Sequence, residues 1–171
     1  SSVTSCVITR LLVGDLAEFS VPIYILQNSW EMILCLGLGL VSALVFVTFT
    51  RSFAISEKMF SHIKCPIWFK PAVGGLLCGA IAIFYPQIMA SGYDVMNEAM
   101  NSHLAITLML ALVIAKIIGT SFILGSGGAG GDLAPSLFIG CMLGGVYGCV
   151  VNYIFPGSTA ATGAYALIGM A

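Results

Sequence analysis

Charged residues are scarce in this chain. Asp, Glu, Lys and Arg make up 8% of its 171 residues, and the formal net charge is −1. Soluble proteins usually carry about a quarter charged residues, so these few charges do not suffice to solvate a soluble enzyme or a disordered chain. The absence of excess positive charge also argues against a nucleic-acid binder. Because hydrophobic residues make up 59% of the chain, the composition predicts a protein that lies in the lipid bilayer.

Clusters of reactive side chains are also absent from the sequence. The six cysteines are scattered, without a CxxC pair and without a histidine at metal-ligand spacing. The cysteines inside apolar runs are predicted to be inert core residues: Cys35, Cys78, Cys141 and Cys149. Because no candidate nucleophile, general base or metal cluster is found, the sequence predicts neither an enzyme nor a bound cofactor or metal ion.

Long stretches without charge predict membrane-spanning helices, each of which needs about 20 apolar residues. The predicted spans cover residues 30–53, 66–85, 102–124 and 132–155. A further apolar stretch begins near Ala160 and is cut off at Ala171, and residues 1–12 have the pattern of the end of another helix. The sequence therefore predicts an all-α, multi-pass membrane protein in which residues 1–171 form a single transmembrane domain, truncated at both ends.

The charges that are present predict an orientation. Four of the six basic residues fall between the first two predicted spans: Arg51, Lys58, Lys64 and Lys70. The positive-inside rule places this connection in the cytoplasm. The acidic residues of the other connections then fall on the opposite side: Asp15, Glu18, Asp94 and Glu98.

Glycines spaced four residues apart predict where helices pack closely. Gly140, Gly144 and Gly148 form two successive GxxxG steps, and Gly75 and Gly79 form another. Such small faces let helix backbones approach one another in lipid.

The most informative segment is GSGGAGGDLAP, residues 125–135, which lies between two apolar helices. Non-helical backbone at membrane depth is tolerated only where protein buries it or where it lines a wet cavity. The five glycines within residues 125–131 allow sharp turns, and the helix is expected to restart near Asp132 with Pro135 in its first turn. The exposed amides and positive dipole end of such a helix start form an anion site of the kind found in transporters.

Two other interpretations of this segment are weaker. Gly125, Gly127 and Gly130 satisfy the dinucleotide pattern GxGxxG, but a helix-length run precedes them where that pattern requires a strand. The segment also suits a plain hinge between two ordinary spans.

The segment GSGGAGGDLAPSLFIGCMLGG resembles the second-half signature of the CLC family of chloride channels and transporters, GSGxxGGxFxP. The upstream stretch from Lys70 to Gly79, followed by Phe84-Tyr85-Pro86-Gln87 and Gly92-Tyr93, is similar to the preceding helix and loop of that family. Lys116 also matches a position where the family often carries a basic residue. The resemblance covers the chain from about Trp30 to Ala171.

The resemblance implies a fold of tilted and broken helices in inverted repeats, a homodimer, and one anion pathway per subunit. This chain would be most of the second repeat of a CLC-type membrane domain, in the plasma or inner membrane. The implied chloride site consists of main-chain amides: Gly131, Asp132, Leu133 and Ala134. The filter loop would comprise Gly125, Ser126, Gly127, Gly128 and Gly130. Since transport breaks no bond, no residue would be catalytic.

The chain departs from the family pattern at the start of this helix. Asp132 replaces a residue that is usually apolar, and Leu133 replaces Phe. We expect the Asp132 carboxylate to cap the helix, and Lys116 to bind backbone carbonyls or Asp132. The first-repeat motifs GSGxP and GxExP do not occur, so channel and chloride/proton antiporter remain equal alternatives. Two other classes also remain open: a carrier of cations or acidic metabolites that uses Asp132 and Lys116, and a membrane scaffold without transport activity.

Overall fold

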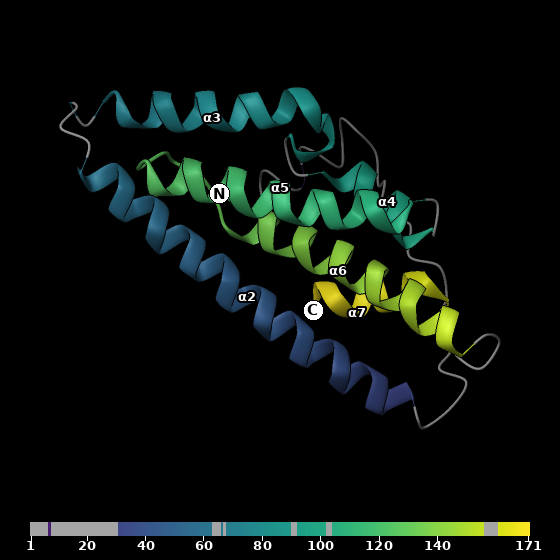
Figure 1. Ribbon diagram of the computed structural model, residues 1–171. Helices are drawn as coiled ribbons and strands as arrows, with labels where there is room; N and C mark the ends of the chain where they lie inside the picture. Colours follow the sequence, from purple (N-terminus) through teal and green to yellow (C-terminus); the bar gives the residue numbers. More distant parts are fainter. Residues whose placement is uncertain are drawn as a thin grey trace.

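The computed structural model describes residues 7, 31–62, 66, 68–89, 92–101, 104–155 and 161–171. Within these ranges the secondary structure is helical, without a strand, which confirms the predicted all-α class (Figure 1). The helix end predicted in residues 1–12 falls outside the described residues except for Val7. Asp15, Glu18 and Lys64 also fall outside them.

The described elements are six α-helices and one short 3₁₀ helix. They are α2 (Glu31–His62), α3 (Lys70–Phe84), η1 (Pro86–Ile88), α4 (Tyr93–Met100), α5 (Ile106–Gly125), α6 (Leu133–Ile154) and α7 (Thr162–Met170). Of these, α2, α5 and α6 are long and apolar enough to cross a membrane. The predicted fourth span, residues 132–155, agrees with α6 to within one residue at each end.

Three predicted spans have other boundaries in the structure. The third was expected from residue 102, but α5 begins at Ile106. The first was expected to end at Phe53, but α2 continues to His62. Charges mark the edge of the hydrocarbon core, and a helix without Pro or Gly can continue beyond that edge. The second was expected from Pro66, but α3 begins at Lys70 with a proline in its first turn. Its 15 residues span about 22 Å, less than the core of about 30 Å.

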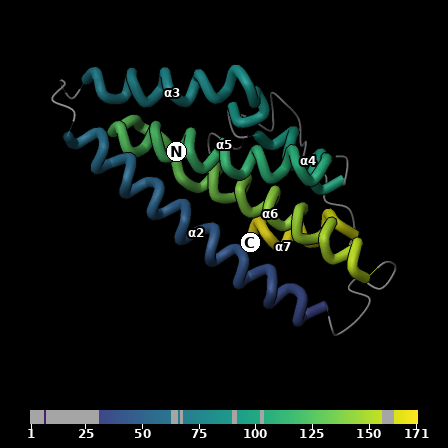
Figure 2. The backbone as a smooth tube through the Cα atoms, in the orientation of Figure 1, coloured from purple at the N-terminus to yellow at the C-terminus, as the bar shows by residue number. Residues whose placement is uncertain are grey.

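Helix α5 lies at the centre of the arrangement. It packs against α2, α3 and α6, while α6 also makes the most extensive helix pair, with α7. In Figures 1 and 2, α2 crosses the other helices obliquely and α3 lies on the opposite side of α5. The buried core joins α4, α5 and α6 through fully buried side chains such as Met96, Leu112, Phe138 and Met142.

Glycines bring α6 and α7 into backbone contact, as the GxxxG spacing predicted. A Cβ atom at Gly140 would meet the carbonyl oxygen of Gly169, and one at Gly144 would meet that of Tyr165. At Gly148 it would lie 2.9 Å from the carbonyl oxygen of Thr162. The order of these partners shows that α7 runs antiparallel to α6.

The prediction for Gly75 and Gly79 is wrong. A Cβ atom at either position would have no atom within 4 Å, so this side of α3 has no close helix neighbour among the described residues. A small-residue face favours helix contact only where a second helix lies opposite it. Here α3 borders a cavity, described below.

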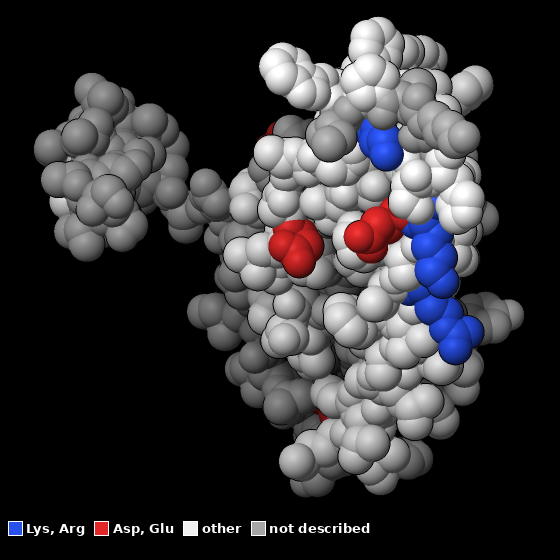
Figure 3. All heavy atoms as spheres, turned by 90° about the vertical axis from the view of Figure 1, so that its left-hand side faces the viewer, with Lys and Arg blue, Asp and Glu red and all other residues white. Residues whose placement is uncertain are grey.

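The described basic residues of the connection between α2 and α3 lie at one end of the molecule, together with the acidic Glu57. Arg51 and Lys58 are exposed on the last turns of α2, near Lys70 at the start of α3. Basic side chains gather on this end in Figure 3. Helix α4, which carries Asp94 and Glu98, lies at the other end (Figure 1).

The close pairing of α6 and α7 predicts a specific sensitivity at Gly144. We expect Gly144→Ala to lower the free energy of unfolding by about 1–3 kcal/mol, because the new methyl group forces two backbones apart. Denaturation in mixed detergent, followed by circular dichroism, measures this change. The control is Gly39→Ala on α2, where a Cβ atom meets nothing within 4 Å and stability should stay equal or rise. Equal losses in both variants would contradict the proposed contact.

Candidate functional site: the break between helices α5 and α6

The carbonyl end of α5 is closed by its own chain. The amide of Gly128 donates to the carbonyl of Ile123 at 3.0 Å, and the amide of Gly127 donates to that of Leu124 at 3.0 Å. Gly127 has φ +82°, the left-handed conformation that this type of helix end requires. The Ser126 hydroxyl adds a bond to the Ile123 carbonyl at 2.8 Å. The last carbonyls of α5 are therefore largely satisfied internally.

Close contact with α2 fixes the position of this helix end. A Cβ atom at Gly125 would lie 2.7 Å from the Cβ atom of Ser56. Within the turn itself, a Cβ atom at Gly128 would lie 2.8 Å from the carbonyl oxygen of Ile123, so this position also has no room for a side chain. Since α5 precedes these glycines, the GxGxxG pattern follows a helix, which excludes the dinucleotide interpretation.

The start of α6 is open, in contrast. The first bond of the helix joins the Ser136 amide to the Asp132 carbonyl at 3.1 Å. The amides of Gly131, Asp132, Leu133 and Ala134 donate no hydrogen bond to another described residue. Gly131, Asp132 and Leu133 are exposed, with Leu133 at 74%. The residues that the sequence predicted for the anion site thus lie together at the start of α6. Their amides donate no hydrogen bond within the described part of the chain.

The expected cap at Asp132 is wrong. Asp132 occupies the N-cap position, yet its side chain makes no capping hydrogen bond. Its backbone has φ −90° and ψ −13°, which is helical. A capping residue normally adopts the extended conformation, from which its side chain reaches back to the amides of the first turn. Of the two partners expected for Lys116, backbone carbonyls or Asp132, the structure shows a carbonyl, that of Ile88.

The break lies well inside the length of α2. Phe46 and Phe49 of α2 line a small cavity together with Ser136 and Ile139 of α6, so the first turns of α6 lie near these residues. At 1.5 Å per residue, Phe49 is about 27 Å from the start of α2 and about 20 Å from its end. The end of α5 lies near Ser56, so the chain returns about 10 Å along α2 before α6 begins.

Lys116 joins α5 to two other elements. Its ammonium group donates to the carbonyl of Ile88 at 2.7 Å and lies 4.9 Å from the centre of the Phe138 ring on α6. The side chain is only 6% exposed. This confirms the expected role as a partner for carbonyls. Lys116 lies nine residues before Gly125, the last residue of α5. It still contacts α6, because α6 runs back alongside α5.

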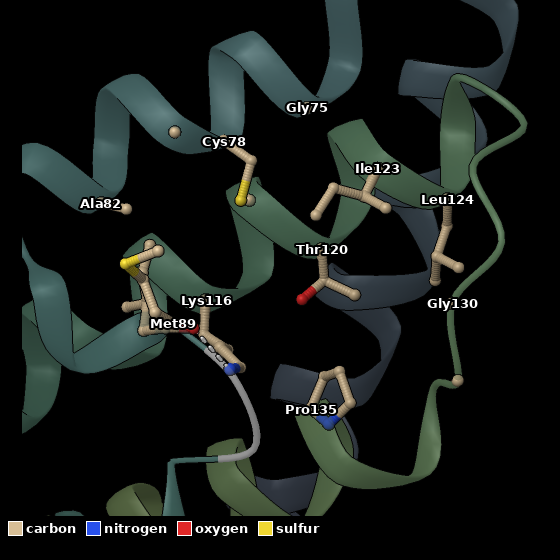
Figure 4. Close-up of a pocket in the computed structure, with 14 residues that line it drawn as sticks. Gly75, Cys78, Ala82, Met89, Lys116, Thr120, Ile123, Leu124, Gly130 and Pro135 are labelled. Atoms are coloured by element: carbon tan, nitrogen blue, oxygen red, sulfur yellow. Dashed lines mark hydrogen bonds between the residues drawn. The ribbon is translucent and has the colours of Figure 1, made fainter. Parts of the chain in front are cut away.

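A cavity of about 350 Å³ lies next to the break. Its walls come from α3, α5 and the loop that leads into α6, and they include Lys116, Gly130, Gly131 and Pro135. Figure 4 shows Lys116 and Thr120 from α5 directed toward the interior, with Cys78 and Ala82 of α3 on the opposite side. The sequence analysis missed this cavity. Its only sequence signal is the spacing of Gly75, Cys78, Gly79 and Ala82, which places four small residues on one helix face.

The chain is similar to known proteins over its whole length. The family model described as "Voltage gated chloride channel" matches residues 1–171. "Chloride channel protein CLC-f" of Arabidopsis thaliana is 37% identical, over 100% of this chain and 24% of the relative. For "Chloride channel protein CLC-e" of the same plant the identity is 30%, over 100% of this chain and 27% of the relative.

A bacterial relative is named for exchange and not for conduction. "H(+)/Cl(-) exchange transporter ClcA" of Yersinia pestis is 29% identical, over 98% of this chain and 36% of the relative. The chain therefore spans about a quarter to a third of the length of these curated relatives. With the three helices long enough to cross a bilayer, the family match confirms the integral membrane protein that the composition predicted.

The absent cap predicts that α6 tolerates the loss of the Asp132 carboxylate. A true N-cap residue contributes about 0.5–2 kcal/mol. We expect Asp132→Ala to change the free energy of unfolding by less than about 0.5 kcal/mol, as for an ordinary surface position. Lys116→Met serves as the reference, because it leaves a buried carbonyl without its donor and should cost about 1–3 kcal/mol. A loss of stability in Asp132→Ala as large as in the reference would show that the cap forms.

Proposed function

The chain belongs to the voltage-gated chloride channel family, and from this premise we propose that it supplies part of the anion filter of a chloride channel or chloride/proton antiporter. The proposed ligands are the main-chain amides of Asp132 and Leu133, with those of Gly131 and Ala134 beside them. Passive conduction and exchange both need such a filter, so the proposal covers both modes. The side chains of this segment need take no part in binding.

The observation that carries the proposal is the contrast between the two helix ends at the break. Carbonyl oxygens repel an anion, and those of α5 are covered by the turn at Gly127 and Gly128. Amide hydrogens attract an anion, and those at the start of α6 have no acceptor among the described residues. The positive end of the α6 dipole adds to this attraction.

The position of the break along α2 is compatible with the same function. The first turns of α6 lie beside Phe46 and Phe49, within the charge-free run of α2 that ends at Arg51. A site built from partial charges also suits transport, because a bound ion has to leave again.

We extend the proposal to the complete protein that contains this chain. Residues 1–171 would form one part of a larger CLC-type membrane domain, most of its second repeat, which assembles as a homodimer in the plasma or inner membrane. Residues outside this chain would complete the pathway. Since the ion crosses without a change in any covalent bond, we assign no catalytic residue.

A carrier that binds substrate through Asp132 and Lys116 together is less well supported. Lys116 is buried, donates to the Ile88 carbonyl and faces the Phe138 ring, whereas Asp132 is exposed. Asp132 is also absent from the described residues that line the cavity around Lys116. The two side chains thus do not form one binding site.

Removal of a single amide tests the filter directly. We expect replacement of Leu133 by its α-hydroxy analogue, which turns the amide into an ester, to weaken chloride binding about tenfold to a hundredfold. A hydrogen bond to a charged group contributes about 1.5–3 kcal/mol, and 1.4 kcal/mol is a factor of ten. Calorimetric titration of chloride and uptake of radioactive chloride into liposomes measure the effect.

The matched control is the same ester at Met32, an exposed residue in the first turn of α2. This change also removes an amide that has no acceptor within its own helix. That amide lies in the first turn of α2, away from the start of α6. Chloride binding should be unchanged there. If both esters weaken binding equally, the amide of Leu133 has no special role.

The charge at Asp132 generates a second test. We expect Asp132→Asn to keep chloride uptake and to raise it several-fold, because a carboxylate beside the filter repels an anion by on the order of 1 kcal/mol. Asp132→Glu keeps the charge and should behave like the unchanged protein. Uptake lost in the Asn variant and retained in the Glu variant would mean that the carboxylate binds substrate, as in the carrier alternative.

A further inference from the structure

One face of α2 is exposed along the whole length of the helix. Its residues recur at three- and four-residue intervals, which places them on the same side of an α-helix. The first part of this face is entirely apolar and consists of Ile33, Leu36, Leu40, Leu44 and Val47. From Arg51 onward the same face is basic, and it continues through Lys58 to His62, all of them exposed. The polarity of the face therefore changes at Arg51.

The position of this change agrees with the dimensions of a bilayer. The charge-free residues 32–50 of α2 are about 28 Å long, close to the hydrocarbon core of about 30 Å. Residues 51–62 add about 18 Å, more than the headgroup layer of about 5–8 Å on one side. Trp68 and Phe69, in the turn before α3, are 89% and 64% exposed, and aromatic residues concentrate at this level of a membrane. The last turns of α2 are therefore expected to pass through the headgroup layer.

The two full positive charges of this face are not neutralised by the described part of the chain. Arg51 and Lys58 form no ion pair with another described residue. The acidic residue of the same turns, Glu57, lies on another side of the helix, since one residue corresponds to a rotation of about 100°. Figure 3 shows basic side chains in a row at this end of the molecule. The face thus has the charge that complements an anion.

The opposite side of these turns is the one that packs against protein. Ser56 and Phe60 are buried there, and Ser56 lies against Gly125 of α5. On the exposed side, Ile55 lies between the two basic residues and is 66% exposed. The exposed face therefore presents an apolar run first and positive charges beyond it. An anionic phospholipid has the complementary order, with acyl chains in the core and a phosphate at its edge.

We propose that Arg51 and Lys58 bind the headgroup of an anionic phospholipid in the leaflet on this side of the membrane. The Arg51 guanidinium, at the end of the charge-free run, would donate to the phosphate. Lys58, about 10 Å further along α2, would add its charge at the outer side of the headgroup. Ile55 and Val47 would contact the apolar part of the lipid. The proposal does not depend on chloride transport, because its test measures lipid binding.

Acetylation of lysine side chains tests this contact. The complete protein is placed in nanodiscs of phosphatidylcholine, with or without phosphatidylglycerol, and treated with sulfosuccinimidyl acetate. Mass spectrometry of the peptides measures the rate at each lysine. We expect phosphatidylglycerol to slow acetylation of Lys58 about fivefold relative to Lys70, because one contact between a basic residue and an anionic lipid is worth about that factor. Lys70 begins α3 at the same end and lies outside the proposed site, so it reports the general surface potential.

Two variants separate a bound lipid from general attraction. Arg51→Gln should remove most of the protection of Lys58, whereas Arg51→Lys should keep most of it. Lys70→Gln removes the same unit of charge from the same end and should leave the protection of Lys58 unchanged. Glycerophosphate, which carries the phosphate without acyl chains, should not protect Lys58 in phosphatidylcholine nanodiscs.

Four results would overturn the proposal. Equal slowing at Lys58 and Lys70 would mean that surface potential alone acts. Full protection of Lys58 in Arg51→Gln would place the lipid elsewhere. Protection by glycerophosphate would identify a site for soluble phosphate. A Lys58 that stays unreactive in phosphatidylcholine alone would show that another protein segment covers this face.

Discussion

The structure depends on one requirement of the hydrocarbon environment: every backbone polar group needs a partner supplied by protein, water or a bound ion. A helix meets this requirement except at its ends, so a break inside the membrane creates two ends that must be treated separately. At the carbonyl end of α5, the turn through Gly127 and Gly128 and the Ser126 hydroxyl provide the partners. At the amide end of α6, the described part of the chain provides none. This difference between the two helix ends is the observation on which the proposed anion site rests.

The rest of the packing fixes where α6 begins relative to α2, α5 and α7. Backbone contact with α7 at Gly140 and Gly144 holds the first half of α6 from one side. Lys116 holds it from α5, through the Phe138 ring, and connects both to η1 through the Ile88 carbonyl. The close approach of Gly125 to Ser56 sets where α5 stops along α2. Because each contact involves a backbone or a buried group, the start of α6 has little freedom to move toward the surface.

Much of this architecture could be predicted from the sequence, because long charge-free runs and glycine spacing carry direct physical meaning. The position of α6, the α6–α7 contact and the break at residues 125–131 follow from those patterns. The end of α2 at His62 could not be predicted, since hydropathy shows where lipid ends and not where a helix ends. The absent cap at Asp132 depends on a backbone conformation that residue identity does not fix. The cavity depends on the placement of α3 across from α5, a tertiary relation between segments about 40 residues apart that no local pattern contains.

The full charge of the buried lysine is compatible with the proposed anion filter because it is bound elsewhere in the structure. An ammonium group in direct contact with chloride at low dielectric constant would hold the ion tightly and slow its release. In this structure the full charge of Lys116 is directed to the Ile88 carbonyl and the Phe138 ring, where it stabilises the fold. The α6 amides at the break contribute partial charges, which are weaker than a full ammonium charge. Lys116 borders the same cavity as Gly130 and Gly131, so its charge lies beside the loop that leads into α6. The exposed carboxylate of Asp132 is itself compatible with this helix start, because negative side chains are favourable near the N-terminus of a helix.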